Sequence, residues 1–120
     1  MCDLATVDVS FISLKKIFPA VNRILKPQGV CICLIKPQFE ASPRQVGKNG
    51  MLKDLKDLPP LLMSIVESAA ENNLFLSGLT VSPIRGTNGN IEYLARFDRT
   101  RAIPPEEIAV LIENAIEELP

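Results

Sequence analysis

Six apolar residues, Val30-Cys31-Ile32-Cys33-Leu34-Ile35, follow one another without interruption and stop at Lys36-Pro37. A strand inside a parallel sheet is buried on both faces, so its sequence is apolar at nearly every position instead of every second one. The run is far shorter than the roughly 20 residues that a membrane-spanning helix needs. We therefore expect a buried strand over residues 30–35, with Lys36 at its carboxyl end.

Upstream of this strand, residues 4–9 predict a first strand that is also largely apolar. Apolar residues at helical spacing then predict a helix over residues 14–25, with Ser13 as its N-cap. Pro19 lies inside this pattern and is expected to kink the helix or to delay its regular start. Residues 26–29 are expected to end it.

Downstream, residues 37–53 are polar and turn-rich, which predicts a long functional loop. A helix follows, with Asp57 as a candidate cap, and it ends at Asn72-Asn73. Residues 74–81 predict a strand, Asn88-Gly89 a hairpin turn, and residues 91–97 the returning strand. A last helix begins at Pro104-Pro105.

Alternating strands and helices predict an α/β fold with three parallel strands, crossover helices and one antiparallel hairpin strand. A sheet this small, with its first strand exposed, leaves an edge and an apolar face to cover. The sequence therefore suggests part of a larger domain, and we expect self-association through the exposed edge to be possible for the chain.

The composition excludes several classes of protein. The chain has 120 residues, 47% of them hydrophobic, a net charge of −1 and no histidine. It therefore lacks the usual general base and the usual zinc ligand, and we expect no metal site. It shows no secretory signal or membrane span, which predicts a cytoplasmic protein without membrane contact. The charge argues against nucleic-acid binding through the overall field, although a local basic patch remains open.

Cys31 and Cys33 are expected to face the same side of the predicted strand. Free cysteines are usually buried, which favours core packing over metal or redox chemistry. With Cys2 the count is odd, and this does not indicate a disulfide framework.

Three charged residues are predicted at one edge of the sheet. In open parallel sheets, ligands bind at the carboxyl ends of the strands. Asp8 and Lys36 end the first two strands, and Glu92 lies just past the hairpin turn. We expect the three to converge, either as an acid–base set for catalysis or as a salt-bridge network.

Four segments within about residues 3–97 are DVSFISL (8–14), LIKPQFE (34–40), VGKNG (46–50), and SPI with GNIEYL (82–84 and 89–94). In this order they resemble the consecutive motifs of FtsJ-like methyltransferases of the TlyA type, which are often named hemolysin A. Each motif is weak alone, and their order makes the resemblance specific.

This resemblance implies the C-terminal half of a Rossmann-like methyltransferase sheet, with S-adenosylmethionine as methyl donor. It implies a ribose 2′-hydroxyl of ribosomal RNA as acceptor, and ribosomal RNA or a ribosomal subunit as partner. By motif, Asp8, Lys36 and Glu92 match three members of the family's Lys-Asp-Lys-Glu tetrad. Lys36 would accept or orient the hydroxyl proton, and Asp8, Val9 and Ser10 would touch the cofactor.

The chain also departs from the family pattern. The first lysine of the tetrad, the glycine-rich cofactor loop and the acidic residue for the cofactor ribose have no match, and neither does the small N-terminal RNA-binding domain. We therefore expect residues 1–120 to form a single partial domain that is weakly active or inactive alone. The alternative is a non-catalytic fragment that binds RNA or protein, and a membrane-active role has little support.

Several loop residues are candidates for RNA contact. Phosphate groups would be bound by Arg44, Lys48, Lys53 and Arg85, although a solvated polar loop explains the same residues. Phe39 and Tyr93 would either stack on a base or pack beneath the loop, and packing is the commoner role of single aromatic residues.

Overall fold

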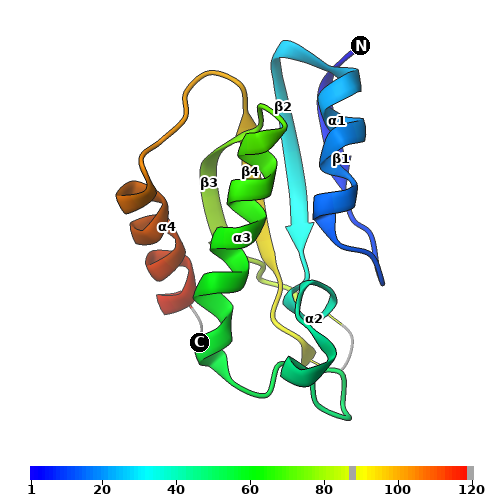
Figure 1. Cartoon of the computed structure of the whole chain (residues 1–120), viewed down its shortest axis with the longest axis vertical. Helices are drawn as coiled ribbons and strands as arrows, with labels where there is room; N and C mark the ends of the chain where they lie inside the picture. The colour runs from blue at the N-terminus through cyan, green and yellow to red at the C-terminus, as the bar shows by residue number, and fades with distance from the viewer. Residues whose placement is uncertain (87–88, 119–120) are drawn as a thin grey trace.

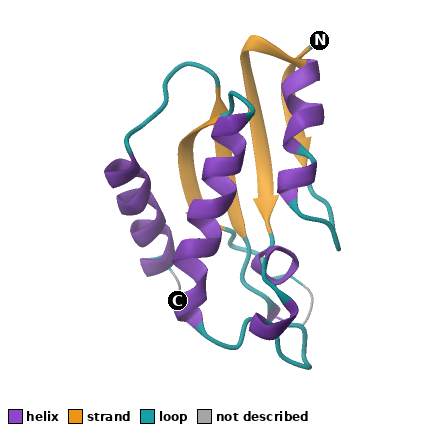
Figure 2. Ribbon diagram, viewed as in Figure 1, coloured by secondary structure: helices purple, strands orange, loops and turns teal. Residues whose placement is uncertain are grey.

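The computed structural model describes residues 1–86 and 89–118, which form a sheet with helices on one side (Figures 1 and 2). The strands are β1 (Cys2–Val7), β2 (Leu25–Ile35), β3 (Phe75–Val81) and β4 (Tyr93–Asp98). The α-helices are α1 (Phe18–Ile24), α2 (Pro37–Glu40), α3 (Leu58–Glu71) and α4 (Pro105–Glu117). The predicted alternation of strands and helices is confirmed.

The strand order is β1-β2-β4-β3, and it corrects the prediction of three parallel strands. Only β1 and β2 pair in parallel, because β4 lies between β2 and β3 and is antiparallel to both. β3 therefore runs in the same direction as β2 without being its neighbour. The sheet is mixed, and it places the ends of β1 and β2 beside the segment that leads into β4.

β2 is longer than predicted. It begins at Leu25, so residues 26–29, which were expected to end the preceding helix, belong to the strand instead. Its burial alternates over residues 29–35, where the odd-numbered residues are buried and the even-numbered ones are half-buried. The sequence is apolar at both sets of positions, and this concealed the alternation.

Local signals in the sequence account for how the helices begin. Ser13 caps a short 3₁₀ helix (Leu14–Lys16), and α1 starts afterwards with Pro19 in its first turn, so the predicted delay is confirmed. Asp57 occupies the cap position of α3, but its side chain makes no capping hydrogen bond. Asp54 caps instead, accepting from the Lys56 amide of the 3₁₀ helix at Leu55–Asp57.

The segment between β2 and α3 is more ordered than a plain loop. It contains α2, a 3₁₀ helix at Pro43–Gln45 and an antiparallel bridge between Val46 and Leu52. The predicted hairpin turn at Asn88-Gly89 lies partly outside the described residues, since Asn88 is not described.

The hydrophobic core lies between the helices and one face of the sheet. Buried side chains from β2 and β4, including Cys33, Ile35, Tyr93 and Phe97, pack against α1, α3 and α4. Figures 1 and 2 show these helices on the same side of the sheet. The opposite face carries half-buried apolar residues from the central strands, namely Val30, Ile32, Leu34 and Leu94. This face has no helix over it among the described residues.

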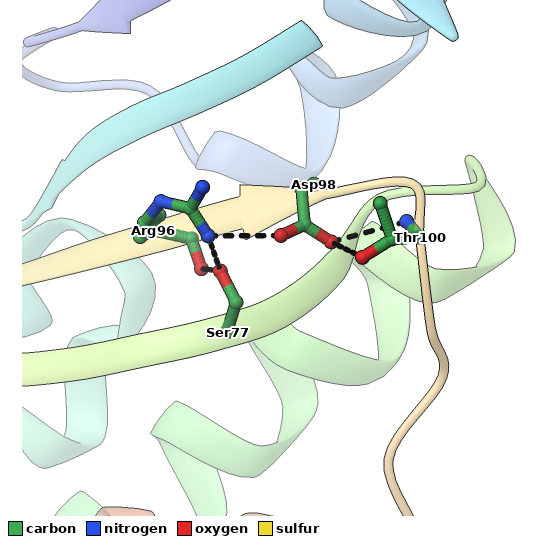
Figure 3. A network of polar contacts seen from close by, with 4 residues as sticks. All are labelled: Ser77, Arg96, Asp98 and Thr100. Atoms are coloured by element: carbon green, nitrogen blue, oxygen red, sulfur yellow. Dashed lines mark hydrogen bonds and ion pairs between the residues drawn. The ribbon is translucent and has the colours of Figure 1, made fainter. Parts of the chain in front are cut away.

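A network of hydrogen bonds and an ion pair lies at the carboxyl end of β4 (Figure 3). Asp98 is buried and accepts hydrogen bonds from the Thr100 amide at 3.1 Å and hydroxyl at 2.8 Å. It also pairs with Arg96 at 2.8 Å, and Arg96 donates to the Ser77 hydroxyl of β3 at 2.6 Å. The network therefore joins the ends of β3 and β4 to the segment that leads toward α4.

Candidate active site

Asp8 and Lys36 meet where β1 and β2 end. The Lys36 Nζ lies 2.6 Å from the Asp8 Oδ1 and donates to the Ser10 Oγ at 3.1 Å. The Lys36 side chain is only 13% exposed, whereas the Asp8 side chain is 65% exposed. Because the strands are parallel and in register from Leu4–Val30 to Val7–Cys33, their carboxyl ends place these residues side by side. The predicted proximity of Asp8 and Lys36 is thus present in the structure.

Glu92 approaches the same place from the segment that precedes β4. It is 7% exposed, and its backbone carbonyl accepts from the Ser82 amide at 2.8 Å. Its carboxylate lies against Gly86, where a Cβ atom would stand 2.1 Å from the Glu92 Oε2. No hydrogen bond or ion pair joins Glu92 to Lys36 among the described residues. The two side chains instead line a common hollow.

This hollow has a volume of about 200 Å³ and an aromatic wall. Ser10, Phe11, Lys36, Phe39, Gly50 and Glu92 are among its lining residues. Phe11 is 88% exposed, its φ is 63°, and its ring centroid lies 4.7 Å from that of Phe39. A left-handed φ is strained for a large side chain, and such strain tends to occur at functional sites.

Phe11 was not singled out from the sequence as a site residue. The available signal was its position, since it is a large apolar residue between the end of a strand and the cap at Ser13. The two other aromatic residues differ from each other. Tyr93 is fully buried and packs in the core, whereas Phe39 is half-buried against Phe11. Packing is therefore the role of Tyr93, and Phe39 belongs to the wall of the hollow.

The segments after β1 and β2 are held together by Glu40. Its carboxylate accepts from the Ser13 Oγ at 2.6 Å and from the Leu14 amide at 2.8 Å. These bonds fix the start of the 3₁₀ helix against α2, next to the hollow. Val9, one of the predicted cofactor residues, is half-buried and packs on the core, while Ser10 is exposed.

The four predicted RNA-binding residues, Arg44, Lys48, Lys53 and Arg85, are all exposed. The first three lie on the segment between α2 and α3, and Arg85 lies on the segment between β3 and β4, where it donates to the Gly89 carbonyl at 3.3 Å. The two segments touch, because the side-chain amide (Nδ2) of Asn90 donates to the Gly50 carbonyl at 3.3 Å. The structure therefore brings the two segments that carry these residues into contact, and Gly50 and Asn90 at that contact line the hollow.

The cysteines of β2 are buried and lie away from this site on the core face. Their sulfur atoms are 3.4 Å apart, and the contact with Cys31 together with burial holds the pKa of the Cys33 thiol well above its usual range. Their burial confirms the packing role. Among residues 1–86 and 89–118, no group of three or more cysteines and acids is placed to hold a metal ion.

Comparison with known proteins places these residues in a family. A family model described as "FtsJ-like methyltransferase" matches residues 1–99. "Putative rRNA methyltransferase YqxC" from Bacillus subtilis is 39% identical over 96% of this chain. "16S/23S rRNA (cytidine-2'-O)-methyltransferase TlyA" from Mycobacterium tuberculosis is 32% identical over 98% of it.

A solved structure shares the fold. "Putative hemolysin from Streptococcus thermophilus" superposes with a TM-score of 0.83, at 37% identity over 97% of this chain. This chain covers 43% of that protein, and 43% and 45% of the Bacillus and Mycobacterium relatives. It therefore spans less than half the length of the proteins it resembles. No helix among the described residues is long and apolar enough to cross a membrane.

Proposed function

We propose, from the premise that this chain belongs to the FtsJ-like methyltransferase family, that it supplies the catalytic edge of an RNA ribose 2′-O-methyltransferase of the TlyA type. The Mycobacterium relative, a 16S/23S rRNA (cytidine-2'-O)-methyltransferase, supports ribosomal RNA as the substrate. The methyl donor in this proposal is S-adenosylmethionine.

One observation carries the proposal, and it is the environment of Lys36. Its ammonium group is largely shielded from solvent, is held by Asp8 and Ser10, and opens on the same hollow as the buried Glu92. A purely structural ion pair would not need a second buried carboxylate or an exposed aromatic wall beside it. Positioned amine and carboxylate groups are what proton transfer at a hydroxyl requires.

In this proposal Lys36 holds the ribose 2′-oxygen by a hydrogen bond and helps to remove its proton. The Lys36 ammonium group donates a hydrogen bond to this oxygen first. It can accept the ribose proton only after its own proton has passed to Asp8 or to solvent. Glu92, which lines the same hollow without pairing with Lys36, would add a second carboxylate close to the reacting oxygen. S-adenosylmethionine, when bound, would supply the electrophilic methyl group.

The residues after β1 fit such a donor. Asp8 offers an exposed carboxylate, which suits a ligand with a positive sulfonium and an amine, and Ser10 offers an exposed hydroxyl. We propose that Asp8, Val9 and Ser10 touch the donor, and that Arg44, Lys48, Lys53 and Arg85 bind RNA phosphates. The Phe11–Phe39 wall would face the base of the target nucleoside.

The chain is proposed to be one part of a longer catalytic unit that works in the cytoplasm. The relatives are more than twice as long, and we assign the glycine-rich cofactor loop and the N-terminal RNA-binding domain to the part that this chain does not match. On this view the isolated chain is weakly active or inactive, and methylation requires the other part.

The test replaces Lys36 with alanine, and Lys26→Ala is the matched control. Both lysines pair with an aspartate of the β1 side, since Lys26 lies 3.3 Å from Asp3 while Lys36 lies 2.6 Å from Asp8. Lys26 is at the start of β2, at the other end of that strand from Lys36, and does not line the hollow. We expect K36A to reduce methyl transfer about 10²–10⁴-fold and K26A to leave it nearly unchanged.

Methyl transfer is measured from radiolabelled S-adenosylmethionine to ribosomal RNA. The chain is assayed alone and with the N-terminal part of the Bacillus relative added as a separate polypeptide. Normal methylation by K36A would refute the catalytic assignment. RNA binding without methylation in every mixture would favour the non-catalytic fragment.

A further inference from the structure

The charges of this chain are unevenly distributed along the sequence. Residues 9–56 contain nine lysines and arginines and two acids, Glu40 and Asp54, whereas residues 57–118 contain four basic residues and ten acids. The net charge of −1 therefore results from a strongly basic part and a strongly acidic part whose charges nearly cancel.

The fold keeps these parts apart in space. The order β1-β2-β4-β3 places β1 and α1 at one side of the sheet and β3 at the other, with α4 packed beside β3. Figure 1 shows α1 and α4 at opposite sides of the molecule. Thus α1 lies on the side opposite the acidic residues of α4, while the segment after α2 lies at the lower end of the molecule and leads to the start of α3.

Both acids of the basic part are engaged internally. Glu40 accepts from the Ser13 hydroxyl and the Leu14 amide, and Asp54 accepts from the Lys56 amide at 2.9 Å. Neither forms an ion pair with a described residue. These carboxylates serve as helix caps, so they do not pair with the lysines and arginines around them.

Most basic residues of this part form no ion pair, the exceptions being Lys26 and Lys36. Seven are exposed and have no ion pair within residues 1–86 and 89–118, namely Lys15, Lys16, Arg23, Arg44, Lys48, Lys53 and Lys56, and of these Lys15 donates a hydrogen bond to the Ser64 Oγ. In the acidic part of the sequence, Arg96 and Arg101 pair with Asp98 and Glu107. Arg99 is bound by Asn22 and by the Leu25 carbonyl. Free cations therefore concentrate on one side of the molecule.

Lys16 and Arg23 extend this surface away from the hollow. Lys16 ends the 3₁₀ helix that precedes α1, Arg23 lies in the last turn of α1, and both are exposed. The Glu40 bonds fix the start of that segment against α2. The exposed cations thus continue from the hollow along α1.

We propose that this basic side, defined by Lys16 and Arg23 of the α1 segment together with the cations of residues 44–56, binds the RNA phosphate backbone that flanks the target nucleoside. The inference rests on the proposed function for the identity of the polyanion. It assigns to α1 a phosphate-binding role, and it turns the acidic α4 side away from the RNA, where like charge would repel it.

The experiment measures binding of a fluorescent RNA hairpin by anisotropy, without a methyl donor, at KCl concentrations between about 50 and 200 mM. The test variant is K16A/R23A. The control is R101A/N114D, which changes the net charge equally but on the α4 side. Thermal unfolding checks that both variants remain folded.

Loss of two phosphate contacts should lower the slope of log affinity against log salt by about 1.4–1.8. It should also weaken binding several-fold at the lowest salt, while the control remains close to the unmodified chain. Equal effects of the two variants would overturn the proposal, because the overall charge would then explain binding. A chain that binds no RNA hairpin would also overturn it.

Vesicles of phosphatidylserine and phosphatidylcholine provide the second arm. A lipid-binding surface would show tighter, Lys16- and Arg23-dependent binding to vesicles than to RNA, and this result would contradict the proposal. RNA binding is measured independently of methyl transfer. A failed methyltransferase assay would therefore leave the result for the basic side interpretable.

Discussion

At the scale of single residues, the position of Glu92 depends on the absence of a side chain at Gly86. A Cβ atom at residue 86 would lie 2.1 Å from the Glu92 Oε2 and 2.6 Å from its carboxyl carbon. The backbone offers little freedom to relax, since the Gly86 amide donates to the Asn90 carbonyl at 2.8 Å and the Gly86 carbonyl accepts from Gly89 at 3.1 Å. Gly86 is therefore what lets a carboxylate sit buried beside the hollow.

We predict that Gly86→Ala displaces the Glu92 carboxylate and lowers methyl transfer at least as much as Glu92→Gln does. Gly89→Ala is the control. Its φ of 76° makes the substitution cost about 1 kcal/mol, yet nothing lies within 4 Å of the new Cβ atom. Methylation by the complemented chain and its unfolding free energy are both measured. If G86A and G89A were equally active, the positioning role of Gly86 would be wrong.

The sequence predicted the charged residues of the site better than its other residues. Asp8 and Lys36 follow two apolar strands that pair in parallel, so strand boundaries were enough to predict their contact. The position of the Phe11 side chain depends on a left-handed backbone conformation, which no pattern of residues in the sequence predicts. The approach of Gly86 to Glu92 likewise depends on the path of the segment between β3 and β4, and an Asn-Gly turn signal does not determine that path.

At the scale of the elements, the end of β4 is stabilised by Asp98. Burial raises the pKa of this carboxyl, but hydrogen bonds from the Thr100 amide and hydroxyl, and from Arg96, outweigh it and leave the pKa below its usual value. A carboxyl with a lowered pKa contributes stability above its unfolded value of about 4. That contribution is lost as the pH falls through the lower folded value.

We therefore predict that Asp98→Asn lowers the unfolding free energy by about 1–2 kcal/mol near pH 7. The difference between the variant and the unmodified chain should shrink below about pH 4. Urea unfolding of both proteins at several pH values measures it, and the comparison cancels the other carboxyl groups they share. A difference that stayed constant or grew in acid would show that the Asp98 charge is not the source.

The main elements were predicted in type and order, and so were the parallel pairing of β1 with β2 and the antiparallel pairing of β3 with β4, but the pairing of β4 with β2 was not. The spacing of apolar residues predicts whether each segment is a helix or a strand, because the pattern of residues buried on one face is a local property of the sequence. The position of β4 between β2 and β3 is not local. It arises because the returning strand completes hydrogen bonds to both neighbours, and the sequence spacing alone equally allows a strand at the edge beyond β3.

At the scale of the whole molecule, helices cover one face of the sheet, and nothing within residues 1–86 and 89–118 covers the other. Val30, Ile32, Leu34 and Leu94 contribute apolar surface from two central strands, and β1 leaves a free edge. An apolar sheet face without a cover is a site for association. The relatives are more than twice as long, so we expect the part of their length that this chain does not match to pack on this face.

The last prediction distinguishes two partners for the uncovered face, namely the unmatched part of the longer relatives and a second copy of this chain. Adding the N-terminal part of the Bacillus relative should raise the melting temperature in a concentration-dependent manner and reduce binding of a hydrophobic dye. Ile32→Lys places a charge at the centre of the uncovered face and should abolish both effects. Val110→Lys is the control, because Val110 is 54% exposed on α4 and far from that face.

Sedimentation measures self-association of the chain alone, which we predicted through its exposed edge. Dimers that persist in I32K would place self-association at the edge of β1 and leave the apolar face to the added polypeptide. If the added polypeptide binds I32K as tightly as the unmodified chain, this face is not where the longer relatives complete their fold.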